Sequence, residues 1–316
     1  MDLLALRVDL EQGQLAVVLR DASGCTTHAL GGAALARWLE EAAPLLEQLR
    51  ASHGSLRSMD VDAIAGTLRL GTAAGEVVLG GADYAQLRPL LREPARLAVR
   101  EARPRQPDPP GLQSEAEVWE HKYRVGSDGW ELMRSPPPLE RFVAEHPPSP
   151  GARALVPGCG RGHEARLLAR YGAQVVAVDI APSAVVECRR LAADQGLLDR
   201  IEVAMLDFLQ LPEAHHGRYD LVLEHCCYCA IDPRRRDDYV AAAAAALRPG
   251  GRLLGLFWCH PYPGGPPYGG SPEEVIQRFL RAFDMLHSEV PPDSILTRSG
   301  QELILYLEKK HALSRR

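Results

Sequence analysis

The sequence ALVPGCGRGHEARLLARYG, residues 154–172, has the pattern of a short apolar strand, a glycine-rich loop and a helix. Gly158, Gly160 and Gly162 leave room for the backbone to approach a ligand, and the start of the helix offers unpaired N–H groups. Seventeen residues after Gly162, a second apolar strand ends in Asp179. A carboxylate at that place can accept hydrogen bonds from the two hydroxyls of a ribose. The stretch therefore predicts a nucleotide-sized site in an α/β fold.

The spacing of the glycines separates two classes of nucleotide cofactor. A dinucleotide fingerprint, G-x-G-x-x-G, requires glycine at position 163, where this sequence has His163. The spacing G-x-G-x-G is common for S-adenosylmethionine (SAM), which has no pyrophosphate to bind. Asp207 ends a third strand, in AMLDF, where adenine would lie, although a helix N-cap explains this residue equally well. The loop and the two aspartates together favour SAM.

The region around this site alternates apolar strands with helices. The strands are ARALVPG, AQVVAVDI, RIEVAMLDF, YDLVLEH and GRLLGLFW, and this alternation predicts a mostly parallel, doubly wound sheet. The chain ends differently, because AFDMLHSEVPP and QELILYLEKK form a predicted hairpin whose last strand runs antiparallel. We assign this α/β domain to residues 115–316.

The residues before this domain differ from it in composition and in hydrophobic pattern. Residues 102–114, ARPRQPDPPGLQS, are rich in proline and polar residues and are predicted to be a linker. Residues 1–101 predict a separate small α+β domain with strand pairs at 3–21 and 67–80 and a helix at 33–51 that Pro44 kinks or splits. A short helix at 83–91 and a last strand at 95–102 complete it. No chemical constellation stands out there, so its role is open, with substrate delivery, partner binding and homodimer formation as alternatives.

Composition excludes several classes of protein. The net charge of −5 argues against a general nucleic-acid binder. No apolar run approaches the roughly 18 residues that a membrane-spanning helix needs, and the N-terminus lacks the basic region of a signal peptide. The seven cysteines are an odd number spread over 316 residues, which is not a secreted disulfide framework. A cytoplasmic protein that acts on a small molecule fits these properties best.

Three longer motifs resemble one family. WEHKYRVGSDGWEL (119–132) is similar to the segment W-x-x-x-[WY]-x-x-G-x-x-x-W, and LVPGCGRGHE (155–164) to L-V-P-G-C-G-x-G. YDLVLEHCCYCAIDP (219–233), followed by GGPPYGG (264–270), is similar to the block F-D-x-I-x-[DE]-x-x-x-[FY]-C-A-[IL]-x-P and its G-G-P-P-[FY] loop. Residues 115–310 thus resemble class I SAM-dependent methyltransferases, specifically the superfamily of thiopurine S-methyltransferase and the thiol and halide methyltransferases.

The resemblance implies a seven-stranded sheet of order 3-2-1-4-5-7-6, with both ligands at the carboxyl ends of the strands. It also implies cofactor contacts: an aromatic cover, a loop that holds the methionine and ribose parts, a carboxylate near adenine, and a residue beside the sulfonium. The aromatic cover would be Trp119, Tyr123 and Trp130, and the loop contacts would be Gly158, Gly160 and Asp179. Asp207 would be the carboxylate near adenine, and Glu224 the residue beside the sulfonium.

The run HCCYC, residues 225–229, follows the fourth strand and admits three interpretations. A zinc site could use Cys226, Cys229, Cys259 and His260, but the spacing is irregular for a structural zinc site. A redox dithiol would belong to a thioredoxin-like unit, which the surrounding pattern does not match. We therefore interpret the run as the wall of a pocket and predict no metal, with Cys229 as a small packed side chain.

Methyl transfer from SAM needs no metal and no covalent intermediate, so the enzyme must mainly align a nucleophile with the methyl group. The cysteines and aromatic residues predict a polarizable, dry acceptor pocket built from Cys226, Cys227, Trp258 and Tyr268. His225 is the candidate base or anion contact, with a purely structural role as an equal alternative, and Tyr228 is the second catalytic candidate.

The acceptor that these residues favour is a soft nucleophile, with a thiol sulfur as the leading choice. His225, Cys226 and Cys227 differ from the residues that the family usually has after the fourth strand. Other acceptors therefore stay open: a halide, a chalcogen or metalloid anion, an amine or an oxygen. A non-catalytic SAM- or metal-sensing module is the alternative from another class.

Overall fold

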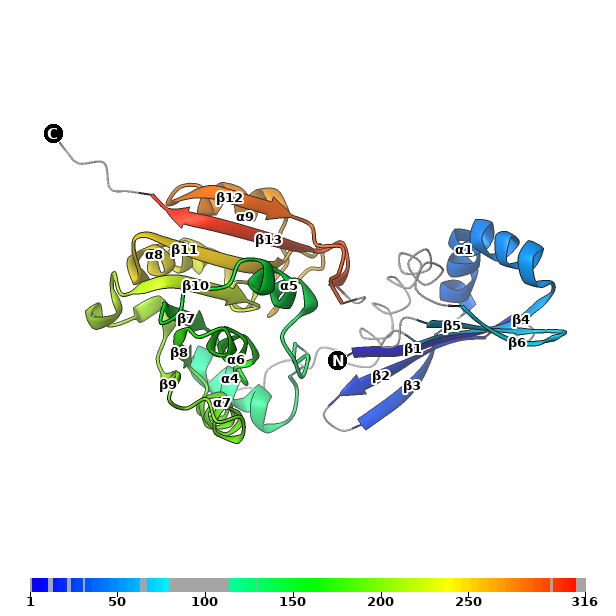
Figure 1. The fold of residues 1–316 in the computed structure, drawn as a ribbon, viewed down its shortest axis with the longest axis horizontal. Coiled ribbons are helices and arrows are strands. Elements are labelled where there is room, and N and C mark those ends of the chain that lie inside the picture. The colour runs from blue at the N-terminus through cyan, green and yellow to red at the C-terminus, as the bar shows by residue number, and fades with distance from the viewer. Residues whose placement is uncertain are drawn as a thin grey trace. The chain divides into compact units, whose positions relative to one another are not determined.

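The computed structural model describes residues 2–10, 14–21, 24–30, 32–62, 67–79, 114–128, 130–295 and 298–310. These residues fall into two compact units, one drawn from Met1–Pro107 and Ile295–Ser299 and the other from Asp108–Ser294 and Gly300–Arg316 (Figure 1). The predicted helix at 83–91, the predicted strand at 95–102 and all but the last residue of the predicted linker at 102–114 lie outside the described residues.

The first unit is an antiparallel sheet with a helix on one face. Its six strands have the order β3-β2-β1-β4-β5-β6. They are β1 (Asp2–Asp9), β2 (Gln14–Asp21), β3 (Gly24–Leu30), β4 (Leu56–Asp62), β5 (Thr67–Thr72) and β6 (Gly75–Leu79). Helix α1 (Gly32–His53) packs Trp38 and Leu46 against Leu6 and Met59 of the central strands, and Pro44 does not split it.

The second unit contains a seven-stranded sheet of order β12-β13-β11-β10-β7-β8-β9. The strands are β7 (Arg153–Pro157), β8 (Gln174–Asp179), β9 (Ile201–Met205), β10 (Tyr219–His225), β11 (Leu247–Trp258), β12 (Phe283–Glu289) and β13 (Glu302–Lys309). Numbered within this unit, the order is the predicted 3-2-1-4-5-7-6, and β13 pairs antiparallel with both of its neighbours. The predicted doubly wound methyltransferase sheet is confirmed.

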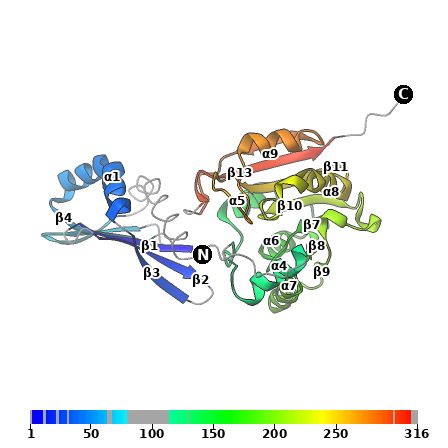
Figure 2. The same ribbon diagram turned by 180° about the vertical axis from the view of Figure 1, so that it is seen from behind.

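Alternate side chains of the buried strands pack into two separate cores, one on each face of the sheet, because successive residues of a strand point to opposite faces. In β7, Leu155 packs into one core, whereas Ala154 and Val156 pack into the other. Helices α8 (Arg236–Ala246) and α9 (Pro272–Phe279) cover the first face (Figure 2). Helices α5 (Pro137–Glu145), α6 (His163–Arg170) and α7 (Pro182–Asp194) cover the second. Short 3₁₀ turns connect several of these elements: η2 (Phe208–Gln210), η3 (Glu213–His215), η4 (Tyr228–Ala230) and η5 (Pro233–Arg235).

Helix α4 (Glu115–Arg124) precedes the sheet and starts at a capping box. The Glu117 N–H donates to Ser114 Oγ at 3.3 Å, and the Ser114 N–H donates to Glu117 Oε2 at 3.0 Å. Farther along α4, the carboxylate of Glu120 accepts hydrogen bonds from the Ser183 N–H (2.8 Å) and hydroxyl (2.7 Å) on α7. The helix is thereby fixed beside the carboxyl ends of the strands. Within the described ranges, none of the helices combines the length and apolar character needed to cross a membrane.

An aromatic cluster joins α9 to the sheet. Phe279 is fully buried, and its ring centroid lies 5.0 Å from that of Phe257 and 5.6 Å from that of Tyr228. Replacing a buried phenylalanine with alanine removes apolar contacts and leaves a cavity.

We therefore expect Phe279→Ala to lower the free energy of unfolding by about 3–5 kcal/mol. Leu280→Ala, at the neighbouring residue whose side chain is 36% exposed, is the matched control and should cost less than about 1 kcal/mol. Urea unfolding followed by circular dichroism measures both. Equal losses for the two variants would contradict the assignment of Phe279 to the core.

Candidate active site

One cavity with a volume of about 140 Å³ lies at the carboxyl ends of the parallel strands. Its wall combines α4, the segment after it, the glycine loop and the ends of β8 to β11. The lining residues include Trp119, Tyr123, Trp130, Glu131, Gly158, Gly160, Arg161, Glu164, Asp179, Asp207, His225, Cys226, Cys227, Cys229 and Trp258. Most of the predicted site residues are therefore brought together.

The glycine loop has no space for side chains. Gly158 and Gly160 have φ angles of 52° and 51°, in the left-handed region that favours glycine. A Cβ atom at Gly158 would lie 2.8 Å from Cys227 Sγ, and one at Gly160 would lie 2.9 Å from the Tyr123 hydroxyl. Bare backbone therefore forms this part of the cavity wall.

Asp179 ties the loop to the end of β8. Its Oδ2 accepts a hydrogen bond from the Gly160 N–H and its Oδ1 one from the Ala181 N–H, each at 2.9 Å. The side chain is buried, and burial raises the pKa of Asp179 above its usual value. Because a carboxylate offers about four lone-pair positions, Asp179 keeps acceptor capacity for hydroxyl groups of a ligand in the cavity.

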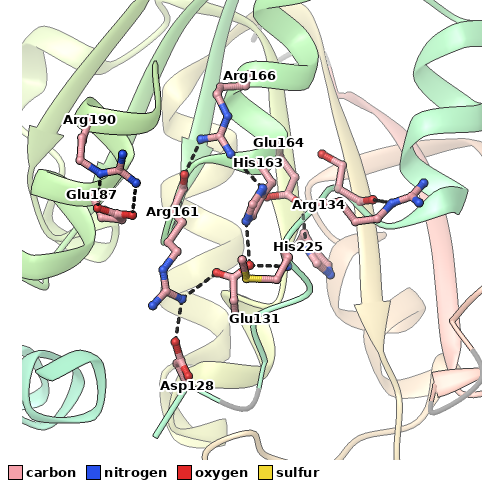
Figure 3. A network of polar contacts seen from close by, with 12 residues as sticks. Asp128, Glu131, Arg134, Arg161, His163, Glu164, Arg166, Glu187, Arg190 and His225 are labelled. Carbon is pink, nitrogen blue, oxygen red and sulfur yellow. Dashed lines mark hydrogen bonds and ion pairs between the residues drawn. The ribbon is translucent and has the colours of Figure 1, made fainter. Parts of the chain in front are cut away.

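An ion-pair network connects the segment after α4 to the glycine loop (Figure 3). Glu131 lies between Arg161, at 2.9 Å, and His163, at 2.7 Å, and Arg161 also contacts Asp128 at 2.7 Å. Burial opposes ionisation of Glu131, but the hydrogen bonds from His163 and Arg161 outweigh it and lower the pKa to about 2. Sequence reasoning missed Glu131, because its partners are 30 and 32 residues away and no local pattern marks them.

The three residues predicted to form an aromatic cover lie together in the cavity wall. The ring centroid of Trp130 lies 5.1 Å from that of Trp119 and 5.5 Å from that of Tyr123, both in edge-to-face geometry. Arg161 lies 5.7 Å from the Tyr123 ring centroid. The network and the aromatic cluster thus hold one wall of the cavity together.

Asp207 confirms one of its two predicted interpretations, that of an N-cap. It lines the cavity, and it is also the N-cap of η2, where its Oδ1 accepts the Leu209 N–H at 2.8 Å. Its contact with adenine stays a prediction.

His225 also lines the cavity and pairs with Glu164, a residue that sequence reasoning did not select. His225 Nδ1 lies 2.9 Å from Glu164 Oε1, and each side chain is only 9% exposed. Burial opposes protonation, but the interactions with Cys226 and then with Glu164 raise the pKa of His225 well above its usual value. A protonated imidazole cannot accept a further proton, so this arrangement favours the predicted anion contact over the predicted base.

Three predicted site residues, Tyr228, Glu224 and Tyr268, are not among the residues that line the cavity, and their ligand contacts stay predictions. The Tyr228 side chain packs in the core, and its hydroxyl donates to Glu274 Oε1 at 3.1 Å. Glu224 is fully buried, and its carboxylate accepts the Tyr228 N–H at 2.8 Å and the Tyr239 hydroxyl. The Tyr268 N–H donates to Cys229 O at 2.6 Å, which fixes the loop behind the wall.

The alternative zinc site also lacks support. Where the structure describes the chain, no group of three or more His, Cys, Asp or Glu side chains is arranged to hold a metal ion. Cys226, Cys229 and Cys259 do not form disulfides.

Comparison with known proteins identifies the family. The family model described as thiopurine S-methyltransferase (TPMT) matches residues 114–313, more than half of the chain. The chain belongs to this family. It is therefore a SAM-dependent methyltransferase.

The methyltransferase is similar to plant enzymes. It is 31% identical over 189 residues to a probable thiol methyltransferase 2 of Arabidopsis thaliana, and 29% identical over 188 residues to thiocyanate methyltransferase 1 of Brassica oleracea. Each match covers 58% of this chain and 81% of the relative. A solved structure of a Burkholderia thailandensis 1,6-didemethyltoxoflavin N1-methyltransferase shares the fold, with a TM-score of 0.51, 22% identity, and coverage of 65% of this chain and 94% of that chain.

The residues in the cavity wall fit the chemical groups of SAM. Bare backbone at Gly158 and Gly160 leaves space for a ligand, and the buried carboxylate of Asp179 offers acceptors for ribose hydroxyls. The aromatic residues Trp119 and Trp130 supply apolar surface in the same wall.

Asp179→Asn should weaken SAM binding by at least about tenfold, because the amide loses the charge and part of the acceptor capacity. Asp220→Asn is the matched control. That carboxylate also accepts a backbone N–H, from Arg153 at 2.8 Å, but it does not line the cavity. Isothermal titration calorimetry measures both affinities, and an unchanged affinity in Asp179→Asn would contradict the cofactor assignment.

Glu224 should make stability depend on pH. Burial raises its pKa in the folded protein from the usual 4.5 to about 7. The folded state therefore binds the proton more tightly than the unfolded state, and stability is lost as the pH rises from about 4.5 through about 7. Gln at this position has no such titration. Its amide oxygen can accept the Tyr228 N–H, and its NH2 group can donate to the Tyr239 hydroxyl in a bond of reversed direction.

We expect the stability of Glu224→Gln relative to the wild type to increase by about 2–3 kcal/mol between pH 5 and pH 8. Urea unfolding at the two pH values measures the difference. A difference that does not change with pH would show that Glu224 is already ionised at pH 5.

Proposed function

We propose that this methyltransferase transfers the methyl group of SAM to a small soft nucleophile, with a thiol sulfur as its principal acceptor. One observation carries the proposal: a single cavity has Gly158, Gly160 and Asp179 in its wall together with the imidazole of His225 and the thiol of Cys226. The names of the plant relatives, a probable thiol methyltransferase and a thiocyanate methyltransferase, support a sulfur acceptor.

The glycine loop and its neighbours are the proposed cofactor end. Gly158, Gly160 and Asp179 would hold the methionine and ribose parts, and Asp207 would lie by the adenine. Trp119, Tyr123 and Trp130 would cover the bound cofactor and exclude water. When bound there, SAM supplies an electrophilic methyl group and a thioether leaving group.

The thiol-rich wall is the proposed acceptor end. Cys226, Cys227 and Trp258 give it a polarizable surface with few hydrogen-bond acceptors, which suits a soft anion better than a hard one. Held by Glu164, the imidazolium of His225 supplies positive charge that attracts a thiolate or another anion. Alignment of such an acceptor with the methyl group supplies the main rate enhancement, since well-oriented reactants gain several kcal/mol.

The remaining expectations of the sequence stay proposals. They are a cytoplasmic location, a linker at residues 102–114, and a homodimer formed through residues 1–101. The absence of a membrane-capable helix from the described residues is compatible with the first of them.

The acceptor class can be measured directly. The full chain is incubated with SAM and with benzyl mercaptan, sulfide, thiocyanate, iodide, benzylamine or benzyl alcohol, and S-adenosylhomocysteine is quantified. We expect product with the sulfur nucleophiles, and at least about 100-fold lower kcat/KM with the amine and the alcohol, because a thiol-lined site leaves their hydrogen-bonding groups unpaired.

Two results would contradict the proposal. Turnover confined to the amine or the alcohol would assign another acceptor class. SAM binding without turnover on any acceptor would favour a sensing module.

A further inference from the structure

Residues 264–270, GGPPYGG, lie between β11 and α9 and reach the cavity through Pro267. The next residue holds this segment against η4, because the Tyr268 N–H donates to Cys229 O at 2.6 Å. Cys229 belongs to η4 and lines the cavity as well. Pro267 and the end of η4 therefore form one continuous part of the cavity wall.

A buried arginine that does not itself line the cavity contacts both components of this wall. Arg236, the first residue of α8, is only 4% exposed. Its Nη2 donates to Gly269 O at 2.9 Å and to Tyr268 O at 3.4 Å, and its guanidinium carbon lies 4.8 Å from the centroid of the Tyr228 ring. One cation thus binds the segment 264–270 through carbonyl groups and η4 through an aromatic ring.

Glu274 on α9 orients the guanidinium. Its Oε2 accepts a hydrogen bond from Arg236 Nη1 at 3.2 Å, and its Oε1 accepts one from the Tyr228 hydroxyl at 3.1 Å. The carboxylate balances the buried positive charge and leaves Nη2 for the carbonyl groups of the segment. A lysine cannot reproduce this arrangement, because its ammonium is a single point charge rather than a planar fork of donors.

The glycines of the segment permit its close packing. A Cβ atom at Gly269 would lie 2.6 Å from His260 O and 2.9 Å from Tyr262 O. A Cβ atom at Gly270 would lie 3.3 Å from Arg236 Nη1. The backbone of the segment is therefore packed against both the residues that follow β11 and the guanidinium, so its position depends on where the guanidinium lies.

The wall that these contacts hold is apolar at three neighbouring positions. Ala230 and Ile231, at the end of η4 and directly after it, line the cavity together with Pro267. None of these three side chains carries a hydrogen-bonding group. An apolar substituent bound there would leave water, which is favourable, whereas a small inorganic anion has no such substituent to bury.

We propose that Arg236 is a positioning residue for the methyl acceptor: it fixes the segment 264–270 against η4 and thereby shapes an apolar wall that binds the organic group of a thiol. This inference rests on the proposed function and narrows its acceptor class to thiols that carry an apolar substituent. Arg236 touches neither the cofactor nor the acceptor and acts through Pro267.

The proposal is tested by comparing the wild-type protein with Arg236→Lys on benzyl mercaptan and on thiocyanate. We expect the KM for benzyl mercaptan to rise about tenfold and its kcat to change less than about threefold, because a displaced wall loses binding that the ground state and the transition state share. The KM for thiocyanate and the Kd of SAM, measured by calorimetry, should each change less than about threefold.

Arg278→Lys is the matched control. Arg278 also pairs with Glu274, at 2.8 Å, and its other partner is Asp237 on α8. The substitution makes the same chemical change beside the same carboxylate, at a residue that does not line the cavity. It should leave the KM for benzyl mercaptan within about twofold of the wild-type value.

A double-mutant cycle tests whether Arg236 acts through Pro267. Pro267→Ala removes part of the wall directly and should raise the KM for benzyl mercaptan. Because residues that act through one another are not additive, adding Arg236→Lys to Pro267→Ala should raise this KM by no more than about twofold. Increases that simply multiply would show that the two residues act independently.

Amide hydrogen exchange gives a readout that does not depend on methyl transfer. The N–H groups of Tyr268 and Gly270 both donate to backbone carbonyl groups outside the segment. Loosening the segment should therefore speed exchange in the peptide that contains residues 264–270 by at least about tenfold in Arg236→Lys, but not in Arg278→Lys. Mass spectrometry of the peptide measures both rates.

Gly269→Ala displaces the segment without a chemical change at Arg236, because its Cβ atom would collide with backbone oxygens. It should also raise the KM for benzyl mercaptan and leave the KM for thiocyanate nearly unchanged. This variant keeps the comparison valid if Arg236→Lys does not fold.

An unchanged KM for benzyl mercaptan in Arg236→Lys, or equal increases for both acceptors or in the Kd of SAM, would overturn the proposal. So would equal exchange rates in Arg236→Lys and Arg278→Lys, or wild-type turnover confined to thiocyanate. A wild-type protein that methylates neither acceptor would contradict the proposed function instead, and the exchange rates would still decide whether Arg236 fixes the segment.

Discussion

The hydrogen bonds of Asp179 are the constraint on which the cofactor end depends. Its buried carboxylate accepts backbone N–H groups from both sides of the end of β8, at Gly160 in the loop after β7 and at Ala181 before α7. Removing either bond would leave a buried polar group without a partner, which typically costs about 1–3 kcal/mol. The same carboxylate therefore fixes the loop geometry and presents acceptors to a ligand.

Two further ionic groupings define the cavity. Glu131 holds the segment after α4 against Arg161 and His163, so the aromatic cover is tied to the glycine loop rather than packed alone. In the second grouping, Glu164 on α6 holds His225 at the end of β10. The first grouping fixes the aromatic residues at the proposed cofactor site, and the second fixes an imidazole at the proposed acceptor site.

The fold of the second unit could be predicted well, because the sequence patterns that mark its strands and its glycine loop are local. Apolar strands alternating with helices, three glycines and a strand-ending aspartate are readable within short windows, and the family resemblance supplied the strand order. Partners far apart in sequence were not predictable: Glu164 and His225 are 61 residues apart. The positions of Glu224 and Tyr228 outside the cavity wall have a physical reason too. The chain turns into η4 directly after β10, which directs Tyr228 into the core and leaves its N–H bonded to Glu224. In the first unit, β3 and β4 were missed because their alternating patterns are short and contain polar residues.

The central claim is that one cavity holds SAM through Asp179 and receives a soft anion beside His225 and Cys226. A crystal structure of the full chain with S-adenosylhomocysteine and thiocyanate tests it most directly. We expect ribose hydroxyls within hydrogen-bonding distance of the Asp179 carboxylate, and thiocyanate in contact with the imidazole of His225. A nucleoside bound without contact to Asp179, or thiocyanate bound only outside this cavity, would contradict it.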